Sequence, residues 1–391
     1  MMYTPCVSVK MMKTLRIALF MNATRAYEQG LIRGILKYSR LHGPWNIFRI
    51  MPVVSGGRNV TVADVRAWRA DGIIWREDDN FKELRRLDIP MVVAPYRAIF
   101  KEYSNILTND AAIGKMAAEH FLDRGFRSFA FYGIGQRYWS IDRQQNFSAR
   151  LAKSGFSTAL CTDLPGDTQN RRQSRLADWL ISLPKPLALM VCTDDCSHDC
   201  LEACKYSGLH IPEDVAIIGV GNDSLICDSS YPPLSSVVID TEQAGYNAAE
   251  QLVRLIHKSK TGVVDIIAEP VHIVTRQSTD ILATTDKNLS LAIKYIRDNA
   301  GHKTSVEDVV KAIPVSRRLL YQKFRDVLGR SIHEEIRRVQ MSYAAKMLVE
   351  TDLQVAEVAA RLGYQDAKNL ARVFKQEKQT TPLAYRKKHV K

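Results

Sequence analysis

Hydrophobic and polar positions alternate in two different ways along the chain. Up to about residue 280, short apolar runs rich in β-branched residues are separated by longer segments with apolar residues three and four positions apart. The short runs are Ile17–Met21, Gly72–Trp75, Met91–Val93, Phe129–Tyr132, Ala188–Cys192 and Val215–Val220. The longer segments are Glu28–Arg40, Ala111–Arg124, Asp142–Lys153, Asp195–Tyr206 and Glu242–His257. Strands that alternate with helices predict an α/β region with a parallel sheet and helices on both faces.

This α/β pattern is interrupted near residues 110 and 235, as expected of two similar lobes between which the chain crosses back and forth. A cleft between two lobes is the usual place for a small ligand. The last strand-like run is Ile266–Thr275, and a wholly helical pattern follows it. We therefore expect a ligand-binding α/β domain at 13–280, a linker at 281–288 and a helical domain at 289–391; that the first domain also dimerises is implied only by the resemblance described below.

Capping signals divide the helical domain into seven helices. Ser305-Val-Glu-Asp308 and Ser331-Ile-His-Glu334 have the form of capping boxes, Gly329 and Gly363 end helices, and Pro382 begins the last one. Pairs of helices at 305–328 and 354–377 predict two helix-turn-helix units. The helix that joins them, Ser331 to Val349, spans about 28 Å at 1.5 Å per residue, close to the roughly 34 Å between successive major grooves.

The charge of the chain is concentrated in this helical domain. The net charge is +13, and residues 286–391 contain 22 Lys or Arg against 12 Asp or Glu, whereas residues 1–285 are nearly balanced. A local basic surplus is typical of a nucleic-acid-binding region.

Other classes of protein are disfavoured. No apolar run reaches the roughly 18 to 20 residues of a membrane span, and the first apolar run is too short for a secretory signal, so we expect a cytoplasmic protein without a membrane partner. Cys196, Cys200 and Cys204 recur every fourth residue, which fits one buried helix stripe better than a thiolate metal site, so neither a metal nor a cofactor is expected. An enzyme on a doubly wound sheet would need a nucleophile elbow or a phosphate loop, and neither motif is present.

The α/β region resembles a known family. The resemblance rests on the strand followed by Asn22, the Asn109-Asp110 turn, Phe129-Ala-Phe-Tyr-Gly133, Arg143 opening a helix, Cys192-Thr-Asp194 and Ile211-Pro-Glu-Asp-Val-Ala-Ile-Ile-Gly219. Together these are similar to the effector domains of LacI/GalR regulators, which have the periplasmic-binding-protein type I fold. The resemblance implies a sugar or nucleobase site at the carboxyl ends of the strands. The residues that it and the chemistry of sugar hydroxyls nominate are Asn22, Tyr27, Trp139, Arg143, Asp194, Asn222 and Asp223.

Two of these residues have an alternative reading. Asp194 follows a strand and is also suited to cap the next helix. Arg143 is expected in the first turn of a helix, where the dipole disfavours a cation and so favours a specific ligand contact over a structural role. Gly221 stands where this family usually has Asp, so the sequence leaves the identity of the sugar open.

The helical domain resembles the AraC/XylS family over residues 288–388. The matching residues are Ser316-Arg-Arg-Leu-Leu-Tyr-Gln-Lys-Phe324, Val358-Ala-Ala-Arg-Leu-Gly-Tyr364 and Thr381-Pro-Leu-Ala-Tyr-Arg386, with departures at Gln379 and Leu370. The resemblance implies that helices 316–327 and 366–377 enter DNA grooves. It nominates as contacts Arg317, Arg318, Tyr321, Gln322, Ala367, Lys368, Asn369 and Arg372. Such side chains suit direct readout of base edges, although a merely solvated basic helix face is the alternative, favoured for Lys375 and Lys387.

The order of the two domains adds a further implication. A LacI/GalR-type effector domain followed by an AraC-type arm is the arrangement of xylose-operon regulators, and the chain resembles them over nearly all of its length. The resemblance implies a sugar-responsive regulator of transcription, acting as a homodimer on double-stranded operator DNA, with RNA polymerase as a partner and activation as the expected outcome. An extracytoplasmic solute-binding protein is the main alternative, and it would need an export signal and no DNA-binding arm.

Overall fold

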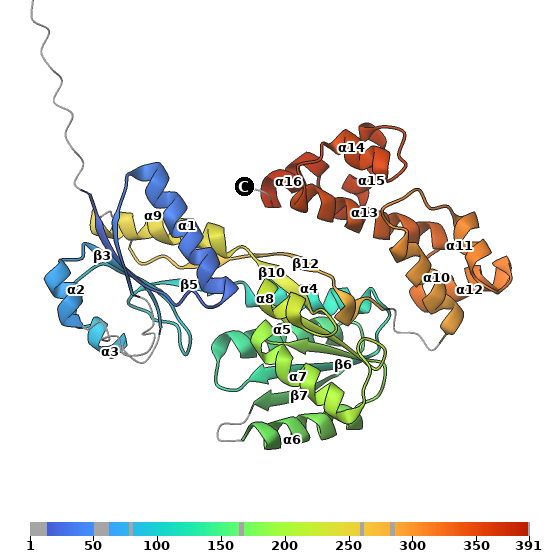
Figure 1. Ribbon diagram of the computed structural model, residues 1–391, viewed down its shortest axis with the longest axis horizontal. Helices are drawn as coiled ribbons and strands as arrows, with labels where there is room; N and C mark the ends of the chain where they lie inside the picture. Colours follow the sequence, from blue (N-terminus) through green and yellow to red (C-terminus); the bar gives the residue numbers. More distant parts are fainter. Residues whose placement is uncertain are drawn as a thin grey trace, which may run out of the picture.

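The computed structural model describes residues 14–50, 62–77, 81–163, 168–258, 262–281 and 286–389. These residues form two α/β lobes and a helical region (Figure 1). The chain therefore has the predicted fold class, a two-lobed periplasmic-binding-protein-like region followed by an all-α region.

The first lobe is a six-stranded sheet in the order β11-β5-β4-β3-β1-β2, and all its strand pairs are parallel. Its strands are β1 (Arg16–Phe20), β2 (Asn46–Ile50), β3 (Gly72–Arg76), β4 (Met91–Ala94), β5 (Ser104–Thr108) and β11 (Ile266–Ala268). Its helices are α1 (Ala26–His42), α2 (Val62–Trp68), α3 (Phe81–Leu84) and α9 (Thr241–Ile256). Alternate residues of β1 face opposite sides, so Ile17 and Leu19 pack towards α1 and α9 while Ala18 packs with Val65 of α2 and Leu84 of α3.

The second lobe has the strand order β12-β10-β9-β8-β6-β7, with only the β10–β12 pair antiparallel among the described strands. Its strands are β6 (Ser128–Ile134), β7 (Thr158–Asp163), β8 (Leu187–Val191), β9 (Val215–Val220), β10 (Ser235–Ile239) and β12 (Pro270–Val274). Its helices are α4 (Asp110–Leu122), α5 (Tyr138–Ala152), α6 (Gln169–Ser182), α7 (Asp194–Ser207), α8 (Ser224–Ser229) and a 3-10 turn, Gln277–Thr279. Cys200 and Cys204 of α7 are buried in the core between α6, α7 and the sheet.

The chain crosses between the lobes three times, at Asn109, Asp240 and Glu269. The sequence predicted crossings near 110 and 235; the third arises because the single run predicted at Ile266–Thr275 divides into β11 in the first sheet and β12 in the second. The three crossing segments are hydrogen-bonded to one another. Asn109 donates through Nδ2 to Glu269 Oε2 at 2.8 Å, and the Asp240 amide donates to the Glu269 carbonyl at 2.9 Å.

Helices α1 and α9 lie side by side on the first sheet at a close approach that needs glycine (Figure 1). A Cβ atom on Gly34 would lie 1.9 Å from the Glu242 carbonyl oxygen, and one on Gly245 would lie 2.1 Å from that of Leu31. Because both obstacles are backbone atoms, neither position accepts a side chain without separating the helices.

The helical region contains the seven predicted helices. They are α10 (Lys287–Asp298), α11 (Val306–Ala312), α12 (Arg317–Leu328), α13 (Ile332–Glu350), α14 (Val355–Arg361), α15 (Ala367–Lys378) and α16 (Pro382–His389). The two predicted capping boxes, Ser305 with Asp308 and Ser331 with Glu334, are both present. Half of the predicted linker, residues 282–285, lies outside the described residues, and α10 begins within its last part, at Lys287, with Asp286 as its cap.

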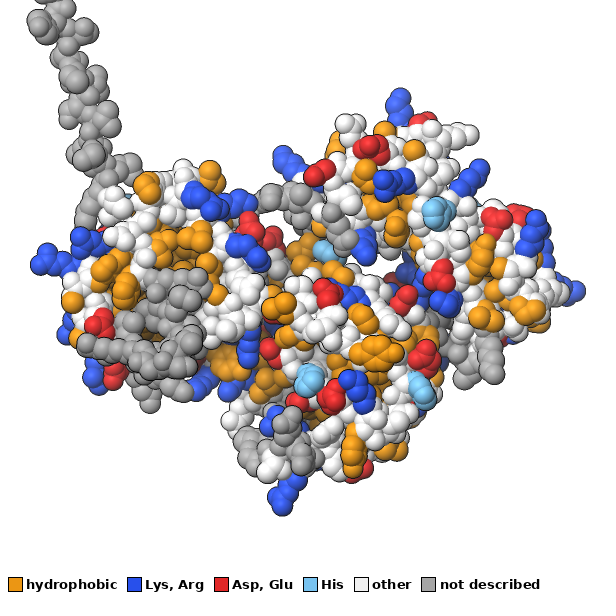
Figure 2. Space-filling view, in the orientation of Figure 1, with side chains coloured by type: hydrophobic (Ala, Val, Ile, Leu, Met, Phe, Trp, Pro, Cys, Tyr) orange, Lys and Arg blue, Asp and Glu red, His pale blue; other side chains and the backbone are white. Residues whose placement is uncertain are grey.

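The helical region contacts the second lobe at the loop after α4 and at the residue that follows the 3-10 turn. Arg330 donates to the Asp123 carbonyl at 2.9 Å, and Arg297 of α10 pairs with Asp280 at 3.1 Å. Acidic and basic side chains are interspersed where the helical region meets the second lobe (Figure 2). Of the helices that the structure describes, none is long and apolar enough to cross a bilayer.

Candidate functional site

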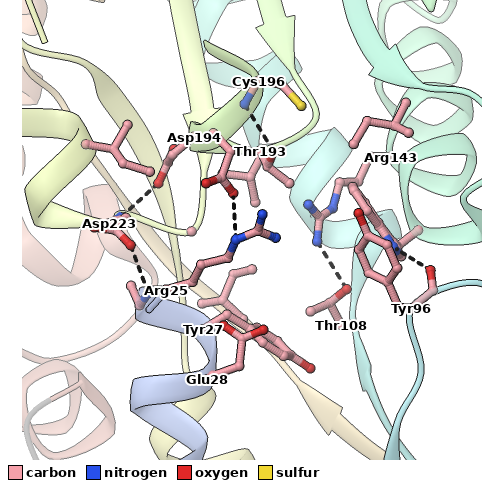
Figure 3. Close-up of a pocket in the computed structure, with 18 of the residues that line it drawn as sticks. Arg25, Tyr27, Glu28, Tyr96, Thr108, Arg143, Thr193, Asp194, Cys196 and Asp223 are labelled. Atoms are coloured by element: carbon pink, nitrogen blue, oxygen red, sulfur yellow. Dashed lines mark hydrogen bonds and ion pairs between the residues drawn. The ribbon is translucent and has the colours of Figure 1, made fainter. Parts of the chain in front are cut away.

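A cavity of about 230 Å³ lies between the two lobes, at the carboxyl ends of their strands. Its size is somewhat below the roughly 300 to 1,000 Å³ of ordinary small-molecule sites, which suits a ligand of monosaccharide size. Polar side chains from both lobes point into it (Figure 3). The first lobe contributes the start of α1, the end of β3 and the loop after β4, and the second contributes α5, the start of α7 and the loop after β9.

Five of the seven residues nominated from the sequence line this cavity: Tyr27, Trp139, Arg143, Asp194 and Asp223. The other two do not. Asn22 is exposed to solvent, and Asn222 is turned away to accept a hydrogen bond from Arg276 Nη1 at 2.9 Å.

Arg143 is held at the base of the cavity by a fixed set of acceptors. Its Nε donates to Asp110 Oδ1 at 2.7 Å, its Nη1 to the Cys192 carbonyl at 2.6 Å, and its Nη2 to Thr108 Oγ1 at 3.2 Å. The expectation that Arg143 opens a helix is wrong, because α5 begins at Tyr138 and Arg143 lies in its second turn. The helix dipole therefore has no part in orienting this side chain, and the buried Asp110 carboxylate has that role instead.

Asp194 is a cavity residue and not a helix cap. Thr193 caps α7, accepting from the Cys196 amide, whereas the Asp194 carboxylate accepts from Ser236 Oγ at 2.6 Å and from the Asp223 amide at 2.8 Å. Burial raises the pKa of Asp194 to about 6, although these hydrogen bonds oppose the shift.

Gly221, the departure from the family pattern, lies directly beside Asp194. It has φ +125°, and a Cβ atom there would be 3.3 Å from Asp194 Oδ2. A side chain at this position would be strained, and an aspartate would bring a second carboxyl towards the first. The glycine thus keeps a further carboxyl group away from Asp194 Oδ2.

The sequence did not nominate Glu28 and Arg76, which form the opposite wall. Arg76 Nε lies 3.5 Å from Glu28 Oε1, while Glu28 Oε2 is buried and has no hydrogen-bond partner among the described residues. Burial raises the pKa of Glu28 against the opposing effect of Arg76. Features of the sequence could have nominated both residues. Glu28 is a charged residue on the same face of α1 as the buried Leu31 and Ile35, and Arg76 ends a buried strand.

The two lobes are closed on one another around the cavity. Trp139 Nε1 of the second lobe donates to the Tyr96 carbonyl of the first at 3.1 Å, and the Ala26 amide donates to Asp223 Oδ2 at 2.9 Å. Arg25 of the first lobe and Asp195 of the second form an ion pair at 3.5 Å. Direct bonds between lobes on several sides of the cavity define a closed conformation of the cleft.

The arginines of the cavity are all neutralised. Arg25, Arg76, Arg143 and Arg172, the four that line it, each lie within 4.0 Å of a carboxylate. Asp194 and Asp223 have no ion-pair partner among the described residues. The cavity therefore offers carboxylates that are hydrogen-bonded but not ion-paired as further acceptors, and no surplus of positive charge for an anionic ligand.

The second candidate site is the pair of helix-turn-helix units. Helices α12 and α15 repeat the same pattern fifty residues apart: Leu320 and Phe324 are buried in one, and Leu370 and Phe374 in the other. The residues nominated for DNA contact occupy the remaining faces. Arg317, Arg318, Gln322, Lys368 and Arg372 are exposed, and Tyr321, Ala367 and Asn369 are partly exposed.

Two of these residues have partners within the protein. Arg317 pairs with Glu307 of α11 at 3.1 Å and donates to the Tyr321 hydroxyl at 3.3 Å. Both contacts are exposed, so they restrain the arginine only weakly and leave it able to rearrange.

Comparison with known proteins identifies both regions. A periplasmic binding protein-like domain model matches residues 118–279, and a helix-turn-helix domain model matches residues 309–388. The chain is 30% identical to the xylose operon regulatory proteins of Escherichia coli K12 and Haemophilus influenzae, over 95% of its own length and 96% and 98% of theirs. It also matches a solved structure of the xylose-binding transcription activator xylR, with a TM-score of 0.61 and 29% identity over 97% of this chain and 99% of that one. With this identity over almost its whole length, the chain belongs to the family of xylose operon regulatory proteins and is a sugar-responsive, DNA-binding regulator of transcription.

Proposed function

We propose that the interlobe cavity binds D-xylose or a closely related neutral sugar, and that closure of the lobes on this sugar controls binding of operator DNA. The observation that carries the proposal is the unpaired, buried Glu28 Oε2 in a cavity whose arginines are already neutralised. A buried acceptor without a donor is costly, and a sugar hydroxyl supplies the missing donor. The names of the full-length relatives support xylose as the first sugar to test.

Each wall of the cavity has a role in this binding. Glu28, Asp194 and Asp223 accept from sugar hydroxyls, and Arg76 and Arg143 donate to hydroxyl oxygens while their carboxylate partners hold them in place. The indole of Trp139 and the rings of Tyr27 and Tyr96 offer apolar faces to the carbon side of the sugar.

On the DNA side, α12 and α15 occupy successive major grooves. The 19 residues of α13 between them span about 28 Å, which suits one monomer reaching two grooves on the same side of the duplex. Arg318 and Arg372 can grip guanine edges, Gln322 and Asn369 can pair with adenine, and Ala367 can meet a thymine methyl group. Arg317, Tyr321 and Lys368 complete the contact set.

We further propose that the regulator acts in the cytoplasm as a homodimer and activates transcription through RNA polymerase. The apolar side chains of Leu225 and Tyr231, 73% and 79% exposed on the second lobe, are candidates for the dimer contact. In such a dimer the sugar repositions two arms relative to one another. Inserting about half a helical turn between DNA half-sites should then reduce the sugar-induced gain in affinity.

Calorimetric titration of the full-length protein tests sugar binding. D-Xylose should bind, and its oxidised acid, D-xylonate, should bind much more weakly, because every arginine that lines the cavity in the described part of the chain is already paired with a carboxylate. Glu28→Gln should weaken xylose binding by roughly tenfold or more, the usual effect of losing a hydrogen bond to a charged group. Asn22→Ala is the matched control, since Asn22 lies outside the cavity. Equal weakening in both variants, or preference for the acid, would refute the proposal.

A further inference from the structure

A second cavity, of about 600 Å³, lies between the second lobe and the helical region. Its wall on the lobe side is formed by α4, the loop after α4 and β12, and its opposite wall by α10, α13, α15 and α16. Acidic and basic side chains gather where these two parts meet (Figure 2). The cavity is separate from the sugar cleft and shares no residue with it.

The acidic residues that line this cavity are each already paired with a cation. Asp280 pairs with Arg297 at 3.1 Å, and Glu377 pairs with Arg337 at 2.7 Å. Glu119 pairs with Arg150 at 3.2 Å, and Asp123 lies 4.0 Å from Arg338. None of these carboxylates forms an ion pair with Arg124 or Lys378 among the described residues.

Arg124 lines the cavity from the lobe side without a carboxylate partner among the described residues. Its Nε donates to the Thr279 carbonyl at 3.0 Å, its Nη1 to the His120 carbonyl at 3.0 Å and its Nη2 to Thr275 Oγ1 at 3.4 Å. All of these acceptors are neutral. A largely buried guanidinium with only neutral acceptors is costly unless an anion completes its surroundings.

The facing wall carries two further cations with unused donors. Arg297 Nη2 is buried and makes no hydrogen bond, and Lys378 donates only to Ser342 Oγ, at 3.1 Å, among the described residues. Burial, together with Arg297 and Arg338, holds the pKa of Arg124 well below its usual value, and burial and Arg338 likewise lower the pKa of Lys378. Cations from two separate parts of the molecule therefore repel one another across one cavity.

We propose that this cavity is a binding site for a small phosphorylated ligand, whose phosphoryl oxygens accept hydrogen bonds from Arg124, Arg297 and Lys378. Arginine is well suited to phosphate because its planar donors match a pair of phosphoryl oxygens. The ligand joins an arginine of the effector region to an arginine of the DNA-binding region. Its binding therefore holds the helical arm against the second lobe, and so provides a control separate from the sugar.

Thermal unfolding and calorimetry of the full-length protein test this site with inorganic phosphate and with glycerol 3-phosphate, at an ionic strength matched with sodium chloride. Glycerol, which lacks the phosphoryl group, is the uncharged control and should not bind at this site. Phosphate should raise the melting temperature above its value in chloride and bind once per chain, since a ligand of the native state stabilises it. Tighter binding of glycerol 3-phosphate identifies an organic phosphate as the ligand class, and tighter binding of inorganic phosphate identifies the ion itself.

Arg124→Gln and Arg297→Gln should each weaken phosphate binding by roughly tenfold or more. Arg254→Gln removes an exposed arginine, paired with Glu250 on the first lobe, and should leave binding unchanged. Should Arg124→Gln fail to fold, Lys378→Gln serves as the second variant, because in the described part of the chain Lys378 makes a single hydrogen bond. No stabilisation by either phosphate relative to chloride, or equal stabilisation of the variants and the parent protein, would overturn this site while leaving the sugar site intact.

Discussion

The sugar cleft and the DNA-binding helices each contain an arginine paired with a carboxylate, but the two pairs have very different surroundings. Arg143 and Asp110 are 2.7 Å apart, with side chains only 6% and 5% exposed. Arg317 and Glu307 are 3.1 Å apart, with side chains 59% and 56% exposed. The first pair is locked among buried acceptors, whereas the second lies in water.

This difference matches what each region has to do. A small cleft that recognises hydroxyl groups needs donors and acceptors that are already oriented, because burial makes an incorrectly placed group costly. A helix that reads base edges needs side chains that exchange a weak internal partner for a DNA contact at little cost. Burial, more than the distance between the charges, thus distinguishes a preorganised pair from one that can rearrange.

The largest expected effect comes from breaking the buried pair. Asp110→Asn leaves the Arg143 guanidinium buried without its carboxylate, and it should reduce the free energy of unfolding by about 3 to 5 kcal/mol. Chemical denaturation of the full-length protein measures the change. The matched variant Glu307→Gln breaks the exposed pair and should leave stability essentially unchanged. Similar losses of unfolding free energy in both variants would contradict the claim that burial makes the first pair more important for stability than the second.

A smaller effect is expected from the protonation of Asp194. Its folded pKa of about 6 lies above its ordinary value of 3.8, so the folded state favours the protonated carboxyl. The protonated Asp194 carboxyl therefore stabilises the folded state below about pH 4. This contribution to the free energy of unfolding, about 2 to 3 kcal/mol, is lost as the pH rises through 6. The difference in unfolding free energy between the parent protein and Asp194→Asn should fall by that amount between pH 4 and 7. A difference independent of pH would contradict the assignment.

A further prediction concerns the discrimination between base pairs by the DNA-binding region. Under the proposed DNA-binding mode, in which the exposed Arg318 of α12 grips a base edge, Arg318→Ala should lose about 1 to 3 kcal/mol of preference at particular base pairs. Lys387→Ala should instead weaken binding to all sequences alike. It should also lower the slope of log affinity against log salt concentration by about one. Binding to selected and random duplexes at several salt concentrations separates the two. If Arg318→Ala weakens both duplexes equally, α12 does not read bases.

The smallest effect concerns the ends of α12 and α15. Gly329 ends α12 with φ +66°, and Gln379 ends α15 in the same left-handed conformation with φ +56°. Glycine adopts this conformation without strain, so Gln379→Gly should stabilise the second unit by up to about 1 kcal/mol. The control Gln376→Gly lies inside α15 and should destabilise by a similar amount. Thermal unfolding that ranks the two variants the other way would contradict this account.

The sequence predicted the helical region more fully than the cleft, and the reason is physical. Ser305, Ser331 and Gly329 act on neighbouring residues, so short motifs together with the spacing of apolar residues were enough to place all seven helices. The cleft is assembled from residues far apart in the chain. Glu28 of α1 meets Arg76 at the end of β3, and a rule that inspects one segment at a time passes over such a pair.

The errors within the cleft have a similar origin. Asn22 was nominated because it follows the first strand, yet α1 begins only at Ala26, and it is the first turn of that helix that reaches the cavity. Arg143 was assigned to a first helical turn because the true start of α5, at Tyr138, has no side-chain cap to mark it. Both misplacements are a few residues at a helix start, where local signals are weakest.

The central claim, that sugar in the cleft controls the DNA-binding arm, is tested most directly by operator affinity with and without sugar. Fluorescence anisotropy with a duplex selected from random sequence by the full-length protein gives this affinity. D-Xylose should change the affinity of the parent protein by roughly 5- to 150-fold, the usual range of such coupling. Glu28→Gln, with an unaltered arm, should bind the duplex as the parent does without sugar and show little response to it. A full sugar response in Glu28→Gln, or none in the parent protein, would contradict the account.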